Sequence, residues 1–322
     1  MIFNEWTYLF FILPAVIVFH LVPLAWRPWW LVLSGMSFYA YYSTAFIVLL
    51  VVESLIVFYM VERSDRGARW ALSLGLCVAV GILAYFKYRG LTLYTLDRIW
   101  AAFRQPHFYT VEELLIPLAI SFFTFEFVHY IVDARRGLLP PHPFSHYLAF
   151  IFFFPTMVAG PIKRFQQFDP QVRAAVFSWS DVAHGGARII LGLLKKIVIA
   201  DTMDLWVDNL NSDDGVRAIS SIGVWVGLIA YAVKIYMDFS GYSDIAIGSA
   251  RLFGIVVPEN FDFPYFRTNI AEFWKHWHIS LYRWIVDYIF IPLGGSRAPL
   301  VLTCRNTVIA MGASGLWHGA SW

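Results

Sequence analysis

The sequence predicts an all-α, polytopic integral membrane protein, and three observations support this fold class. Hydrophobic residues make up 59% of the 322 residues and charged residues only 14%, whereas soluble domains average about 45–50% and about 25%. Uncharged apolar stretches recur along the chain, several of them long enough to cross a bilayer as helices. Aromatic residues reach 19%, and Trp and Tyr favour membrane–water interfaces.

The charge balance and the cysteine count exclude several other classes of protein. The 24 Lys and Arg residues nearly cancel the 22 Asp and Glu residues, so no global basic field attracts nucleic acid. Cys77 and Cys304 are the only cysteines, and each lies in an apolar stretch. A disulfide framework or a cysteine metal cluster is therefore not predicted, and no other metal motif occurs.

The amino-terminal region predicts three helices. The uncharged run from Trp6 to Trp26 is expected to cross the membrane as one helix, and Arg27 follows it. The positive-inside rule places the amino terminus outside and Arg27 in the cytoplasm. The next run, from Pro28 to Val52, is expected to divide near residues 43–44 into a hairpin whose second helix continues to Val61.

The rest of the chain predicts further membrane segments. The basic cluster within residues 63–69 indicates a cytoplasmic loop. The apolar run from Trp70 to Phe86 then predicts another membrane-spanning helix. Residues 87–111 are more polar and are expected outside the membrane. Other apolar segments lie near 114–132, 144–160, 186–200, 218–237, 279–292 and 299–320. This gives roughly eight to ten embedded helices, some short enough to be re-entrant.

These helices are expected to form one membrane domain over residues 1–322. Within it, residues 1–110 supply amino-terminal helices and residues 111–322 carry the motifs described below. The chain stops at Trp322, inside an apolar segment with no polar tail, so a truncated sequence is expected.

Ionisable residues inside apolar segments are candidates for function because burying them in a membrane is costly. Glu126, His129 and Asp133 are spaced three and four apart and share one helix face. They either line a polar cavity or form a buried hydrogen-bonded network that fixes helix packing, and the second interpretation is favoured.

A second cluster begins at Lys234. Lys234 and Asp238 are spaced to neutralise each other, and Asp244 lies on a neighbouring stripe. Gly241 and Gly248 are two turns apart, which allows another helix to approach closely. A structural ion-pair role for this cluster is at least as well supported as direct chemistry.

Two histidines lie near an expected membrane interface. His276 and His278 are two residues apart, so a continuous helix would turn them to different sides. Glu272 and Lys275 are then suitable partners for His276, which leaves His278 facing inward. Trp274 fits an interfacial anchor.

A further histidine, His318, follows Trp317 in an uncharged stretch rich in Gly, Ala and Ser. Small residues let a substrate or another backbone come close. Imidazole is a suitable general base near neutral pH, although a lone histidine is more often a hydrogen-bonded core residue.

Several long stretches, in order, resemble the membrane-bound O-acyltransferase (MBOAT) family. They look most similar to its bacterial branch for alginate O-acetylation, with D-alanyl transfer proteins for teichoic acid as near relatives. The matching stretches are LIPLAISFFTFEFVHYIVDARRG (115–137), FPTMVAGPIKRFQQF (154–168), KKIVIAD (195–201), a block over 236–297 containing DFSGYSDIAIG, PENFDFPY, EFWKHWHISL and DYIFIPLGGSR, and GLWHGASW (315–322).

The resemblance implies a helical bundle with re-entrant segments around a central channel. It also implies that His318 is the catalytic histidine and His278 its helper. Residues expected to line the channel or support the site are Asp238, Asp244, Trp274, Trp317 and Glu126.

The implied activity is acyl transfer in the bacterial inner membrane. The expected donor is a cytoplasmic thioester such as acetyl-CoA, with no bound cofactor or metal. Expected partners are a periplasmic acetyltransferase, a polysaccharide acceptor such as alginate and membrane lipid, but no nucleic acid. The alternatives are D-alanyl or other acyl transfer to teichoic acid or peptidoglycan, and a non-catalytic transporter or scaffold; no internal repeat of the kind many transporters show is evident.

Overall fold

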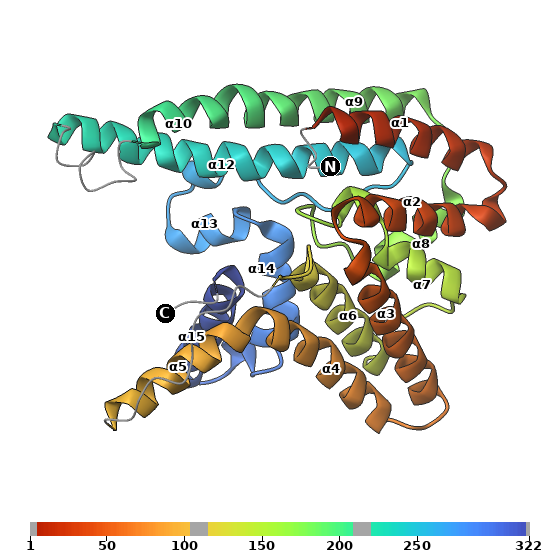
Figure 1. The fold of residues 1–322 in the computed structure, drawn as a ribbon, viewed down its shortest axis with the longest axis horizontal. Coiled ribbons are helices and arrows are strands. Elements are labelled where there is room, and N and C mark those ends of the chain that lie inside the picture. The colour runs from red at the N-terminus through yellow and green to blue at the C-terminus, as the bar shows by residue number, and fades with distance from the viewer. Residues whose placement is uncertain (1–4, 104–114, 209–219, 320–322) are drawn as a thin grey trace. The chain divides into compact units, whose positions relative to one another are not determined.

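A computed structural model describes residues 5–103, 115–208 and 220–319, and helices dominate these ranges (Figure 1). Within them the only extended pairing is an isolated bridge between Phe261 and Trp277. The predicted all-α class is confirmed. The chain divides into two compact units, each assembled from separated stretches. The first comprises residues 1–38, 152–163 and 167–280, and the second comprises residues 39–151, 164–166 and 281–322.

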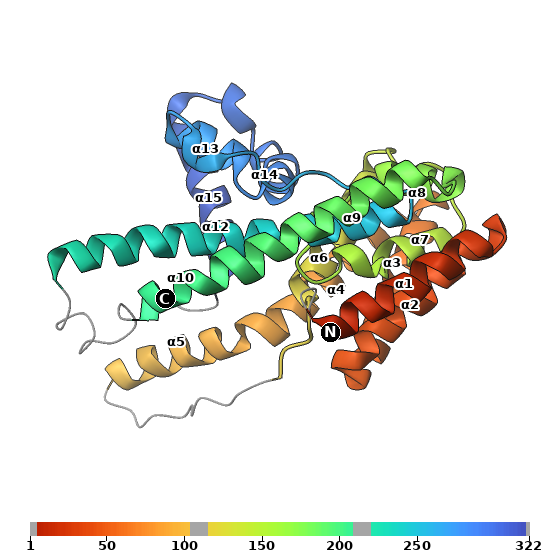
Figure 2. The ribbon, with the colours of Figure 1, turned by 90° about the horizontal axis from the view of Figure 1, so that it is seen from above.

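The first unit is built around one long helix and a helical segment that packs along it. Its elements are α1 (Trp6–Leu21), η1 (Leu24–Trp26), most of α2 (Arg27–Tyr42), η3 (Phe154–Thr156), most of α8 (Phe165–Ala174), α9 (Trp179–Leu193), η4 (Leu194–Ala200), α10 (Asp201–Val207), α12 (Ser221–Leu252), η6 (Pro264–Phe266) and α13 (Ile270–His276). In both views α9 runs alongside α12 (Figure 1 and Figure 2).

Glycines let α9 and α12 approach in antiparallel orientation. A Cβ atom built on Gly192 would lie 2.6 Å from the carbonyl oxygen of Gly241, and one on Gly248 would lie 2.6 Å from that of Gly185. Both distances are far below van der Waals contact, so no larger residue fits without a shift of backbone. The predicted close approach at Gly241 and Gly248 is confirmed.

The helix α12 is longer than its apolar stretch predicted. It has 32 residues and a length of about 48 Å at 1.5 Å per residue, and it continues from the predicted segment 218–237 to Leu252. The added turns contain Asp238 and Asp244. Apolar patterning alone misses this continuation because salt bridges to α9 and η4 compensate both carboxylates.

The second unit contains the remaining helices. They are α3 (Thr44–Asp65), α4 (Trp70–Leu83), η2 (Ala84–Tyr88), α5 (Arg89–Ala102), α6 (Ile120–Arg135), α7 (Phe144–Ile151), most of α14 (Ile279–Ile285), η7 (Val286–Phe290), η8 (Gly295–Arg297) and α15 (Leu300–His318). Helix α4 packs against both α3 and α6 (Figure 1). The predicted break between α2 and α3 is confirmed, since Ser43 is extended.

Two helix predictions were wrong. The run from Trp6 to Trp26 is not one helix: α1 ends at Leu21, because Pro23 favours an extended residue before it and Val22 is extended. The helix that begins at Trp70 also does not end near Phe86. It passes through the π-helical turn η2 into α5, so the described part of residues 87–111 is largely helical; residues 104–111 lie outside the described ranges.

Three helical segments within the described ranges are long and apolar enough to cross a membrane. They are Thr44–Asp65, Trp70–Ala102 and Ser221–Leu252. Trp6–Leu21 and Phe144–Thr156 are shorter apolar helices.

Candidate active site

His318 is the last residue of α15, and its side chain is exposed. The last backbone bond described for α15 runs from the Gly319 N–H to the Gly315 carbonyl, and the carbonyls of Leu316 and Trp317 come next at the end of the helix. Side chains of the second unit bind both of them. The Tyr88 hydroxyl donates to the Leu316 oxygen at 2.9 Å, and the Lys87 ammonium donates to the Trp317 oxygen.

Trp317 fixes the end of α15 by ring packing. Its indole lies 6.0 Å from the ring of Phe122 and 5.4 Å from that of Phe125, both on α6. The Phe125 ring in turn lies 4.5 Å from Trp284, whose indole N–H donates to the Phe125 carbonyl at 3.1 Å. The imidazole of His318 lies 4.4 Å from the Trp317 ring. The histidine therefore extends from a helix end that neighbouring aromatic side chains hold.

His278 lies in the first unit, at a break between α13 and α14. Its side chain is only 3% exposed, and its ring meets the Phe239 ring edge-on at 4.7 Å. The expected burial of His278 is confirmed, but the expected continuous helix is wrong. Trp277 is extended, and His278 has a left-handed backbone conformation with φ of 45°. Residues other than Gly rarely adopt this conformation.

A buried polar network holds this turn, and Asn260 is at its centre. The Asn260 backbone carbonyl accepts the Ile279 N–H at 2.9 Å, and its side-chain oxygen accepts the Ser280 hydroxyl at 2.6 Å. The Asn260 amide donates to the Ser243 hydroxyl at 3.1 Å. Ser280 also accepts the N–H of Ile162 at 3.0 Å. These bonds compensate for the strained backbone beside His278.

The two histidines belong to different compact units, so the catalytic pairing of His278 with His318 stays a prediction. Glu126 is buried on α6 at 7% exposure, and its predicted place at a channel also stays a prediction. The same holds for Trp274, which is 38% exposed on α13.

Both carboxylates predicted near the site are engaged in salt bridges. Asp238 binds Lys196 at 2.7 Å, while Asp244 binds Arg188 at 2.7 Å and Lys195 at 2.6 Å. The expected pair of Lys234 with Asp238 is wrong, because Lys234 reaches across to Asp204 on α10. Asp204 on the neighbouring helix α10 therefore takes the place of Asp238, which lies one turn away on the same helix as Lys234. The structural ion-pair interpretation of this cluster is supported.

Of the two partners expected for His276, Glu272 is confirmed, and the Asp262 carboxylate lies 3.5 Å from Nε2 on the other side of the ring. The His276 Nδ1 lies 2.7 Å from the Glu272 carbonyl oxygen and 3.9 Å from the Glu272 carboxylate. The Lys275 ammonium binds the same carboxylate at 2.8 Å and holds the pKa of Glu272 below its ordinary value. The helix α13 begins with Asn269, whose side chain accepts the Glu272 N–H.

His129 and Asp133 form a buried network, as the favoured interpretation predicted for the stripe that they share with Glu126; the part of Glu126 in it stays a prediction. Nε2 of His129 accepts the Phe165 N–H at 2.9 Å, so the proton of the neutral imidazole is on Nδ1, which lies 2.7 Å from the Tyr288 hydroxyl. Asp133 accepts bonds from Tyr288 at 3.0 Å and from Gln166 at 2.6 Å. The network joins α6 to residues 164–166 and to η7.

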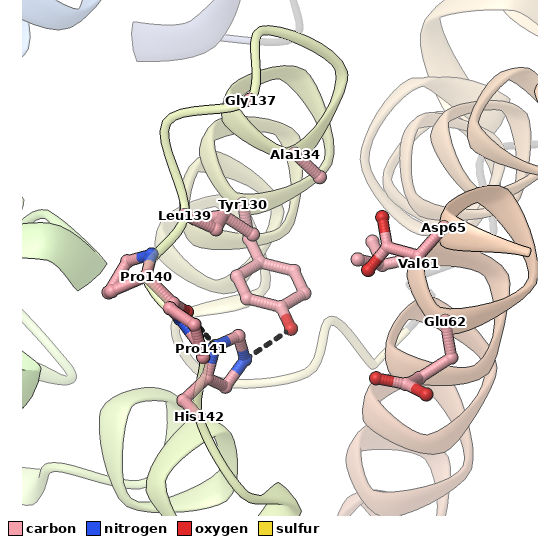
Figure 3. Close-up of a pocket in the computed structure, with 10 residues that line it drawn as sticks. All are labelled: Val61, Glu62, Asp65, Tyr130, Ala134, Gly137, Leu139, Pro140, Pro141 and His142. Carbon is pink, nitrogen blue, oxygen red and sulfur yellow. Dashed lines mark hydrogen bonds between the residues drawn. The ribbon is translucent and has the colours of Figure 1, made fainter.

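A pocket of about 370 Å³ lies elsewhere in the second unit, between the ends of α3 and α6. Figure 3 shows Glu62 and Asp65 facing Tyr130 and His142 across it. His142 Nδ1 donates to the Pro140 carbonyl at 2.7 Å, so its Nε2 accepts the Tyr130 hydroxyl at 2.7 Å. None of the predicted site residues lines this pocket.

Sequence reasoning assigned no role to Lys87, Tyr88 or Asn260. Asn260 belongs to the PENF motif, and this motif could have marked it as a candidate. Lys87 and Tyr88 had no such signal, because the carbonyls that they bind are 228 or more residues away. Within residues 5–103, 115–208 and 220–319, no group of three His, Cys, Asp or Glu side chains is placed to hold a metal ion.

Comparison with known proteins places this geometry in a family. The profile of the MBOAT, membrane-bound O-acyltransferase family, matches residues 70–322. A probable alginate O-acetylase from Azotobacter vinelandii is 34% identical over all of this chain and 65% of its own length. The chain thus spans about two thirds of the length of that relative.

Two other relatives are named for different acceptors. A peptidoglycan O-acetyltransferase from Helicobacter pylori is 35% identical over 91% of this chain and 60% of its own length. A teichoic acid D-alanyltransferase from Bacillus subtilis is 34% identical over 61% of this chain and 50% of its own length. The family profile matches most of the chain, which also has the all-α fold and the apolar spans expected of a membrane protein. The chain belongs to the membrane-bound O-acyltransferase family.

Proposed function

We propose that this protein is a membrane O-acyltransferase of the bacterial inner membrane. It takes an acetyl group from a cytoplasmic thioester, acetyl-CoA, and passes it across the membrane for O-acetylation of an exported or cell-surface polysaccharide. A periplasmic acetyltransferase is the proposed partner. Family membership and the names of the acetyl-transferring relatives support this proposal. The observation that carries it is the exposed imidazole of His318 at an anchored helix end.

The proposed chemistry uses His318 as general base. Its imidazole takes the proton from the acceptor hydroxyl as that oxygen attacks the thioester carbonyl. A C–O bond forms, the C–S bond breaks, and the imidazolium returns the proton to the leaving thiolate. His278 is proposed to orient the acceptor or to stabilise the oxyanion.

The direct test replaces His318 by Ala in the purified protein. With the partner acetyltransferase present, we expect the rate of acetyl transfer from labelled acetyl-CoA to a polysaccharide to fall by about 10²-fold or more, because general base catalysis contributes about 10²–10⁴-fold. His276→Ala is the matched control, since its imidazole is bound to Glu272 on α13. It should keep most of the activity.

The elution profile and thermal unfolding midpoint of each variant establish that it is folded. Near-normal transfer by folded His318→Ala protein would remove the assignment of this residue. Failure of the wild-type protein to consume any thioester would favour the non-catalytic transporter or scaffold.

D-alanyl transfer is the second candidate because of the similarity to the Bacillus subtilis relative. Offering acetyl-CoA and a D-alanyl carrier-protein thioester in parallel separates the two. Our proposal requires turnover with acetyl-CoA, whereas turnover with the aminoacyl donor alone would replace it.

A further inference from the structure

A cationic side chain contacts the helix end that carries His318. Lys87 lies in the π-helical turn η2, which interrupts the helix running from α4 to α5. Single π-helical turns within α-helices are frequent at functional sites, because the inserted residue redirects the side chains around it. The sequence alone assigned this lysine no function.

Lys87 connects α6 and α15. Its ammonium donates to the Trp317 carbonyl, lies 3.4 Å from the Ser121 hydroxyl and stands 5.6 Å from the centre of the Trp317 indole. The side chain is half buried. The positive charge of Lys87 therefore lies beside Trp317, the residue that immediately precedes His318.

The position of this charge matters for the proposed reaction. The carboxyl end of a helix carries a partial negative charge of roughly half an electron, located at its last carbonyls. Acyl transfer develops further negative charge, first on the thioester oxygen and then on the leaving sulfur. Without a nearby cation, the partial negative charge at the end of α15 would disfavour the negative charge that develops on both atoms.

We infer that Lys87 is a positioning residue of the acyl-transfer site, which fixes the last turn of α15 and offsets its negative end where His318 acts. This inference rests on the proposed role of His318. Tyr88 provides the natural comparison, because it binds the adjacent Leu316 carbonyl on the same helix end without any charge.

The experiment compares Lys87→Met, Lys87→Arg, Tyr88→Phe and His318→Ala in the purified protein, with acetyl-CoA as the varied substrate. Lys87→Met keeps the length of the side chain but removes the cation. We expect it to lower kcat by about 10–100-fold, while KM for acetyl-CoA changes by less than about threefold. Lys87→Arg should restore most of kcat, and Tyr88→Phe should lower it by less than about threefold.

The outcomes separate this inference from the proposed function. Loss of activity in His318→Ala together with near-normal kcat in folded Lys87→Met would overturn the role of Lys87 alone. So would equal losses in Lys87→Met and Tyr88→Phe with no restoration by Arg, because anchoring without charge would then account for the effect. Activity retained by His318→Ala would instead remove the proposed base.

Discussion

Asn260 shows how one buried amide shapes the backbone beside a candidate functional residue. It is fully buried, and it binds the chain directly after His278 through both its backbone and its side chain. These hydrogen bonds stabilise the turn and so offset the strain of the left-handed conformation of His278. The orientation of the imidazole thus depends on a residue 18 positions earlier in the chain.

This dependence makes a stability prediction. Asn260→Ala removes the acceptor of the Ser280 hydroxyl proton and the amide donor to the Ser243 hydroxyl, at a cost of about 1–3 kcal/mol for each buried group left unsatisfied. We expect a clearly lower thermal unfolding midpoint in detergent and a loss of acetyl transfer. Asn269→Ala, which removes only the exposed cap of α13, should cost about 1 kcal/mol and less activity. An equal or smaller effect of Asn260→Ala would contradict the role of the network.

At the residue scale, the sequence predicted short-range relations better than long-range ones. The contact of His276 with Glu272 and the shared face of His129 and Asp133 follow from helical spacing, and both are confirmed. The partner of Lys234 does not follow from spacing, because the packed helix supplies Asp204. Spacing does not predict the partner of Lys87 either, because Trp317 is 230 residues away in the sequence.

Helices α9 and α12 form the closest element pair of the first unit, and their contact depends on glycine. At Gly185, Gly192, Gly241 and Gly248, an added Cβ would meet backbone atoms of the opposite helix at 2.6–2.8 Å. The contact also places Asp244 beside Arg188 and Lys195. Separating the helices would therefore expose these charges as well as the packed surface.

The contact predicts opposite effects of one substitution at two glycines of this pair. Gly248→Ala should destabilise the protein by about 1–3 kcal/mol, as overpacking typically does. Gly186→Ala on α9 meets no atom within 4 Å. It should leave stability unchanged or raise it by about 0.5–1 kcal/mol, because Ala is the better helix former. Thermal unfolding in detergent measures both, and a tolerated Gly248→Ala would contradict the close packing.

At the element scale, apolar patterning located the helices but misplaced several ends. The segment 218–237 was extended to Leu252, and the segment ending near Phe86 continued to Ala102. In each case polar residues marked the expected end, yet the structure pairs several of them with other helices. Asp238 and Lys87 are examples. Pro23 follows the end of α1, whereas Pro14 lies inside the same helix, so proline alone did not predict the helix ends either.

The whole molecule consists of two units, each assembled from stretches that are far apart in the sequence. The fold class and the family were predictable because composition and several long motifs agree, and the family profile covers residues 70–322. The division into units was not predictable, because it arises from helix contacts that no single motif encodes. His278 belongs to one unit and His318 to the other.

The proposed activity is transfer of an acyl group across a membrane by a site that needs His318. The most direct measurement uses sealed vesicles containing the protein, with a polysaccharide acceptor and its partner acetyltransferase trapped inside and labelled acetyl-CoA supplied outside. We expect label on the trapped polymer with the wild-type protein and background levels with His318→Ala. Equal labelling of the trapped polymer by the two proteins would contradict this role of His318, and absence of label with the wild-type protein would contradict transfer across the membrane.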